Sequence, residues 1–180
     1  MSVRRLYDRV FHVEDLVPGT SLRTATRTIL ESDIHQFCQL MGDMAGIHMS
    51  RLAAAEGRSG SVIAPGPMIL SVAIALTTST GWFGPILDIF VGADDWRAEK
   101  PTFPNDTVWA QMTVASTRPT SRPGQHLLSL DVELFATGSE VRPAGEEVRV
   151  CRFTMKFLVA NHDIEFIPPR NGHREEANSP

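Results

Sequence analysis

Three stretches in the second half of the chain alternate apolar and polar residues with a period of two. Their apolar positions are Val108, Ala110, Met112 and Val114; Leu128, Leu130, Val132 and Leu134; and Cys151, Phe153, Met155 and Phe157. Because successive side chains of a strand point to opposite faces, each stretch predicts a half-buried β-strand. Proline- and glycine-containing turns separate the stretches, which favours antiparallel pairing. A further extended run, Ile86 to Lys100, precedes them. Val148 and Val150 fall out of phase, and either a bulge or a covered outer face explains them.

The segment from Met68 to Leu76 has a different pattern, since it is apolar on all sides. A helix of this kind is enclosed rather than amphipathic. Pro67 suits its first turn, and Gly81 and Gly84 follow its end.

The first third of the chain mixes both periods. Arg23 to Leu30 is rich in threonine and predicts a strand. Ser32 is a candidate N-cap for a helix that ends at Gly42. A loop over residues 43–48 then leads to a second helical piece, Met49 to Glu56.

The order of these elements predicts an α+β fold. An apolar helix is enclosed only if a curved antiparallel sheet wraps around it. We expect residues 1–167 to form one domain. The polar, proline-bearing stretch over residues 168–180 is expected to be a disordered tail.

Composition narrows the function classes. The 180 residues carry a formal net charge of −4, which disfavours nucleic acid as a partner. The longest apolar run, Val62 to Leu76, is interrupted by prolines and is shorter than the roughly 20 residues of a membrane helix. Met1 to Phe11 lacks the apolar core of a secretory signal, so we expect a cytoplasmic protein.

The two cysteines form no CxxC motif and are expected to be buried free thiols. The histidines lack metal-ligand spacing, and no metal is expected.

Several segments, in order, resemble the MaoC-like hydratases and dehydratases of the hot-dog fold, which include R-specific enoyl-CoA hydratases. Residues 11–19 resemble the entry segment of that family, and residues 27–37 its next strand and helix. Gly42-Asp43 followed by His48 is similar to its Gly-Asp-x-Asn-Pro-x-His motif, and residues 63–68 to the opening of its central helix. Residues 96–108 resemble its Phe-x-x-Pro-x-x-x-Gly-Asp segment.

Two departures from the family pattern stand out. Ala45-Gly46 replaces Asn-Pro, and Pro65 replaces the histidine that precedes the glycine. In the family, that asparagine helps to hold the catalytic loop. The smaller Ala45 predicts a roomier loop and a preference for bulky, branched or functionalised acyl groups.

The resemblance implies three catalytic residues. Hydration of an enoyl thioester needs a base for water, an acid for the α-carbon and a donor to the enolate oxygen. Asp43 and His48 would move the protons, and burial would raise the pKa of Asp43. The N–H of Gly66, at a helix N-terminus, would face the developing negative charge. Taken singly, each residue also suits an ordinary role: Asp43 as a helix-end turn residue, His48 as a core or surface residue, Gly66 as a turn glycine.

We therefore expect a hydro-lyase that acts on a 2-enoyl or 3-hydroxyacyl thioester of coenzyme A or an acyl carrier. It would need no metal or redox cofactor and would form a homodimer. Two alternatives remain open at this point. One is a hot-dog thioesterase, and the other is a non-catalytic or assisting subunit of a hetero-oligomeric hydratase.

Overall fold

A computed structural model describes residues 12–143 and 145–162 of the chain. The expectations for Met1 to Phe11, for the domain end at residue 167 and for the tail over residues 168–180 lie outside the described residues. No helix within the described ranges is long and apolar enough to cross a membrane.

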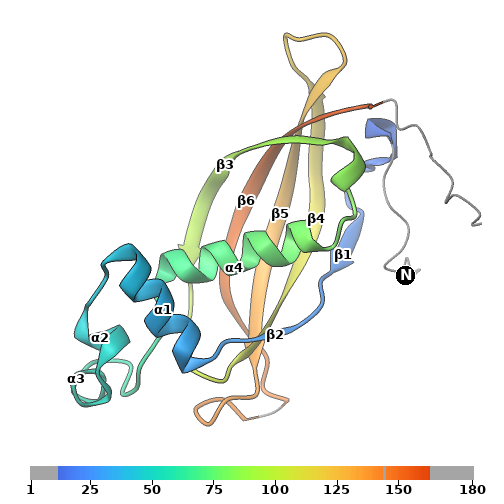
Figure 1. The fold of residues 1–180 in the computed structure, drawn as a ribbon. Helices are drawn as coiled ribbons and strands as arrows, with labels where there is room; N and C mark the ends of the chain where they lie inside the picture. The colour runs from blue at the N-terminus through green and yellow to red at the C-terminus, as the bar shows by residue number, and fades with distance from the viewer. Residues whose placement is uncertain (1–11, 144, 163–180) are drawn as a thin grey trace, which may run out of the picture.

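One antiparallel sheet dominates the structure, and helix α4 crosses one of its faces (Figure 1). The strands pair in the order β1-β4-β5-β6-β3, and β2 also pairs with β4. Their bounds are β1 Ser21–Arg23, β2 Arg27–Thr28, β3 Leu87–Ala98, β4 Thr107–Pro119, β5 Gln125–Thr137 and β6 Val148–Ala160. This is the α+β arrangement that the residue pattern predicts.

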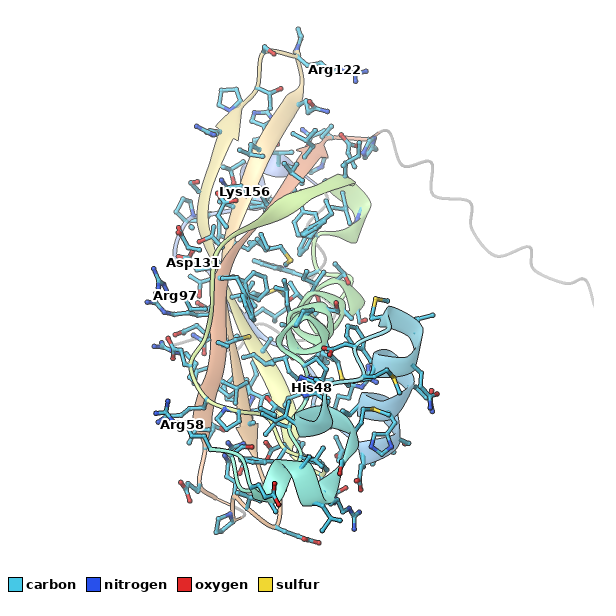
Figure 2. All side chains as sticks on the ribbon, turned by 90° about the vertical axis from the view of Figure 1, so that its left-hand side faces the viewer. His48, Arg58, Arg97, Arg122, Asp131 and Lys156 are labelled. Atoms are coloured by element: carbon cyan, nitrogen blue, oxygen red, sulfur yellow. The ribbon has the colours of Figure 1, made fainter. Side chains whose placement is uncertain are left out.

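The two faces of the sheet differ as the alternation predicts. Every apolar position named above for the three alternating stretches is buried. Polar side chains of the sheet lie on the other face, where Figure 2 shows Arg97 of β3, Asp131 of β5 and Lys156 of β6 on the side away from the helices. The sheet therefore has one apolar face, and that face needs a cover.

A bulge in β6 explains the change of phase at Val150. Leu134 pairs with Cys151 and Phe135 with Arg149, so Val150 has no partner on β5. Val150 and Cys151 are consecutive, yet both are buried. The bulge, rather than a covered outer face, is the correct interpretation.

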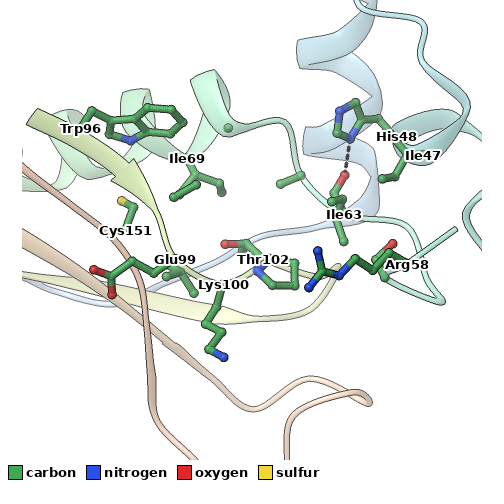
Figure 3. Close-up of a pocket in the computed structure, with 16 residues that line it drawn as sticks. Ile47, His48, Arg58, Ile63, Ile69, Trp96, Glu99, Lys100, Thr102 and Cys151 are labelled. Atoms are coloured by element: carbon green, nitrogen blue, oxygen red, sulfur yellow. Dashed lines mark hydrogen bonds between the residues drawn. The ribbon is translucent and has the colours of Figure 1, made fainter.

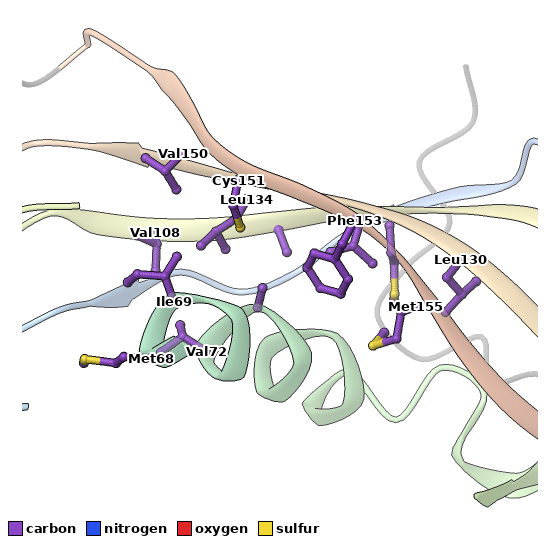
Figure 4. Packing of buried hydrophobic residues seen from close by; sticks show 14 of the residues in the cluster. Met68, Ile69, Val72, Val108, Leu130, Leu134, Val150, Cys151, Phe153 and Met155 are labelled. Carbon is purple, nitrogen blue, oxygen red and sulfur yellow. The ribbon is translucent and has the colours of Figure 1, made fainter. Parts of the chain in front are cut away.

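Helix α4, Gly66–Ser79, supplies the cover (Figure 4). It starts after Pro65 with Pro67 in its first turn. Met68, Ile69, Val72 and Ala73 are buried against the sheet. The opposite side carries half-buried apolar residues, namely Leu70, Ile74 and Leu76. The prediction of an enclosed helix is thus confirmed for the sheet-facing side, while the other side is only partly covered within this chain.

The remaining helices are α1 (Glu31–Met41), α2 (Gly46–Met49) and α3 (Arg51–Ala55), and short 3-10 turns precede β1 and β3. Leu30, not Ser32, is the N-cap of α1, and the Asp33 carboxylate accepts the Leu30 N–H at 3.1 Å. Gly42 ends the helix with a φ of 75°, a conformation that glycine adopts readily.

The predicted strand over residues 23–30 is interrupted at Thr24. The Thr24 hydroxyl oxygen accepts the N–H of Ala110 at 2.9 Å and donates to its neighbour's carbonyl, that of Ala25. A side chain thus replaces a backbone acceptor of the ladder, and β1 and β2 remain separate short strands.

Candidate active site

A pocket of about 600 Å³ opens beside the N-terminus of α4. One wall comes from α2 and from the segment that leads into α4, with Ile47, His48 and Ile63. The opposite wall comes from the end of β3 and the loop after it, and Val150 and Cys151 of the β6 bulge close one side (Figure 3). The local sequence determines helix α2 and the start of α4, whereas the long-range pairing of β3 with β6 brings the opposite wall into place.

His48 has a defined hydrogen-bonding state. Its Nδ1 lies 2.7 Å from the carbonyl oxygen of Ile63. A carbonyl oxygen only accepts, so Nδ1 carries the proton and, in the neutral ring, Nε2 is an acceptor. The side chain is only 14% exposed and lines the pocket. His48 therefore presents a basic nitrogen in a sheltered position, although it belongs to helix α2 and not to the expected loop.

Asp43 lies in the loop after α1 and faces the same nitrogen. Its Oδ2 is 3.9 Å from His48 Nε2, which is too long for a direct hydrogen bond. Its Oδ1 accepts the N–H of Ala45 at 3.4 Å. The Asp43 side chain is 43% exposed, so the expected burial is absent. The structure places the carboxylate beside the pocket rather than in its wall.

Gly66 begins α4 and lines the pocket. Its N–H belongs to the first turn, whose N–H groups have no partner within the helix. A Cβ at this position would lie 2.8 Å from Cη2 of Trp96. Glycine is therefore required here because the Trp96 indole packs directly on the backbone.

Further side chains with polar groups, which sequence reasoning did not select as site residues, also line the pocket: Arg58, Ser59, Trp96, Glu99, Lys100, Thr102 and Cys151. Trp96 packs on the backbone of Gly66 and also forms part of the pocket wall. Burial raises the pKa of the Cys151 thiol to about 12, which the nearby Trp96 only partly opposes, so this thiol is no nucleophile. Both cysteines are free and buried, which confirms the expectation for them. Arg58 falls in the glycine-containing break after α3, where sequence alone marks only a loop.

The replacements at Ala45 and Gly46 do not enlarge the pocket. Ala45 is exposed and does not line it. Gly46 lies against α3, and a Cβ there would approach the Cβ of Ala53 to 2.9 Å. The space vacated at Gly46 is thus occupied by Ala53, and the structure offers no route by which Ala45 makes the pocket roomier.

The described residues contain no group of three His, Cys, Asp or Glu side chains that could hold a metal ion.

Comparison with solved structures defines the fold class. A monoamine oxidase regulatory protein from Archaeoglobus matches with a TM-score of 0.73 at 21% identity, covering 90% of this chain and 99% of that chain. The R-hydratase PhaJ1 from Pseudomonas aeruginosa matches with a TM-score of 0.66 at 16% identity, covering 88% and 94%. A conserved hypothetical protein from Mycobacterium tuberculosis, described as a double hot-dog fold, matches with a TM-score of 0.61 at 18% identity, covering 79% and 39%. The chain has a hot-dog fold.

Sequence comparison then gives the family. A model of the MaoC-like domain matches residues 14–139, and the chain belongs to this family. Protein MaoC of Klebsiella aerogenes is 34% identical over 102 residues, which are 57% of this chain and 30% of that protein. The chain thus spans under a third of the length of this curated relative.

Proposed function

We propose that this protein is a hydratase or dehydratase that adds or removes water across the double bond of a 2-enoyl thioester. One observation carries the proposal: the His48 Nδ1–H donates to Ile63 O and leaves Nε2 facing Asp43, within reach of the pocket that holds Gly66. The family membership and the likeness to the R-hydratase PhaJ1 support the same reaction class.

In the proposed reaction, a water molecule bound between His48 Nε2 and the Asp43 carboxylate loses a proton to this pair. Its oxygen forms a bond to the β-carbon, and the electrons of the double bond move toward the thioester oxygen. The N–H of Gly66, supported by the helix N-terminus, stabilises the resulting enolate. The pair then returns the proton to the α-carbon, so that one water is added in total and no oxidation state changes. The reaction needs no metal or redox cofactor.

The carrier and the acyl group are proposed from the pocket. Its volume of about 600 Å³ and its isoleucine and valine side chains fit an acyl chain bulkier than crotonyl, carried by coenzyme A or an acyl carrier. Two free buried thiols suit a reducing compartment, and we place the protein in the cytoplasm.

A panel of enoyl and 3-hydroxyacyl thioesters, followed by absorbance and mass, tests the proposal. Gain or loss of one water, with the thioester intact, is the expected result. Release of the free carrier thiol would instead identify a thioesterase. The exposed position of Asp43, at 3.9 Å from His48, favours one further candidate, an assisting subunit. That function predicts no turnover by this protein alone and turnover after a second protein is added.

A further inference from the structure

A buried ion pair lies next to the pocket, and the proposed reaction does not use it. Arg142, in the loop between β5 and β6, places Nη1 at 2.5 Å from Oδ2 of Asp106. The two side chains are 7% and 0% exposed. The second carboxylate oxygen of Asp106 is buried and has no hydrogen-bond partner among the described residues. Burial removes both charges from water, and their mutual attraction does little more than offset that cost, so such a pair contributes little net stability.

The contacts of this pair converge on the loop that follows β3. Arg142 Nη2 donates to the carbonyl of Pro101 at 3.1 Å, and Asp106 Oδ2 accepts the N–H of Phe103 at 2.9 Å. The guanidinium also lies 5.7 Å from the centre of the Phe103 ring. Arg142 therefore fixes both ends of a short segment, residues 101–106, that contains the pocket residues Pro101 and Thr102.

This segment in turn holds the chain that enters α4. The carbonyl of Thr102 accepts the N–H of Ala64 at 2.8 Å. Ala64 lies between Ile63, whose carbonyl binds His48 Nδ1 at 2.7 Å, and Pro65-Gly66. The segment over residues 63–66 thus places the acceptor of the His48 Nδ1 proton at one end and the Gly66 N–H at the other.

We infer that Arg142 is a positioning residue, which acts through Pro101–Thr102 and Ala64 on His48 and Gly66 and is needed for their alignment. The inference concerns the proposed hydratase site. Of the measurements that test it, only turnover depends on the proposed function. The bidentate fork of arginine is required, because one group must reach both the Asp106 carboxylate and the Pro101 carbonyl.

Two variants separate alignment from folding. Arg142→Lys keeps a cation beside Asp106 but lacks the fork. Arg142→Met combined with Asp106→Asn removes both charges, so that no carboxylate is left buried alone. Lys156→Met is the control, since it also removes an ion pair, the one with Asp94, and neither of these residues lines the pocket.

The measurements are amide hydrogen exchange at Ala64, the imidazole ¹⁵N signals of His48 and the turnover number. In both Arg142 variants we expect exchange at Ala64 to rise about tenfold relative to core amides of β5, and the Nδ1–H tautomer of His48 to lose population. We expect turnover to fall about 10- to 100-fold, as small misplacements of catalytic groups cause, and the control to leave all three unchanged.

Unchanged Ala64 exchange and unchanged His48 signals in folded variants would overturn the inference, as would a uniform rise in exchange over the whole protein. Both readouts are independent of turnover. If no thioester is turned over, the proposed function fails while the alignment of His48 by Arg142 is still decided.

Discussion

The proton of the His48 imidazole is placed by the backbone carbonyl of Ile63, fifteen residues further along the chain. That contact makes Nε2 the nitrogen that faces Asp43. The identities of Asp43 and His48 alone do not indicate this tautomer, because the tautomer of a histidine depends on the hydrogen bond that its other ring nitrogen makes. The Gly-Asp and His pattern predicts which residues matter, whereas their geometry depends on Ile63.

The Asp43–His48 pair gives the first prediction. Asp43→Asn and His48→Ala should each lower turnover of an enoyl thioester by a factor of about 100 to 10,000, which is the usual contribution of a general acid–base residue. Because both groups act on one water, the double variant should lose little more than the worse single variant. Initial hydration rates measure this. Near-normal turnover in either single variant would remove that residue from the mechanism.

Gly66 gives the second prediction at this scale. In Gly66→Ala the new Cβ would lie 2.8 Å from Trp96 Cη2, and a rigid indole must shift to relieve the contact. We expect altered tryptophan fluorescence and a loss of turnover of about tenfold or more. Gly84→Ala is the control, because a Cβ there meets no atom within 4 Å. Equal effects in both variants would show that the Trp96 contact has no special role.

At the level of elements, the residue pattern predicts the strands with strongly alternating sequences and misplaces the short elements near the site. The long strands β4 to β6 are predictable because each buries one complete face. The bounds of the short elements depend instead on side chains that bond to the nearby backbone. Ser50 accepts the N–H of Ala53 at 3.3 Å and so starts α3 separately from α2. Arg58, Trp96 and Thr102 line the same pocket only because tertiary contacts bring their segments together, and no local sequence pattern predicts those contacts.

Helix α4 gives the third prediction. Met68 is buried at 3% exposure, whereas Leu70 is only half-buried. Met68→Ala should lower the free energy of unfolding by about 2–5 kcal/mol, the usual cost of truncating a buried side chain. Leu70→Ala should cost less than about 1.5 kcal/mol, because the cost follows the apolar area removed from water. Urea denaturation measures both changes in the free energy of unfolding, provided that the slope against urea concentration is the same in the variants and the wild type. If Leu70→Ala costs as much as Met68→Ala, another surface must cover this side of the helix.

At the level of the whole molecule, the sheet formed by the described residues ends in an apolar edge strand with no partner on its outer side. Strand β3 ends the strand order, and Ile89, Phe90 and Val91 in it are 58%, 44% and 52% exposed. Exposed apolar edge strands pair readily with another chain, which is why soluble proteins usually protect them. We therefore propose a homodimer in which a second copy covers this edge, as the family resemblance also implies.

The fourth prediction tests that edge. Ile89→Lys combined with Val91→Lys places two charges on β3 and should convert the dimer to a monomer, because pairing would then bury or oppose like charges. Light scattering after size-exclusion chromatography measures the mass against the 19.8 kDa of one chain. Leu40→Lys is the control, since Leu40 is 78% exposed but lies on α1, away from the edge. A wild-type monomer, or a double variant that remains dimeric, would contradict the proposed interface. A control that dissociates equally would move the interface to the helical side of the molecule.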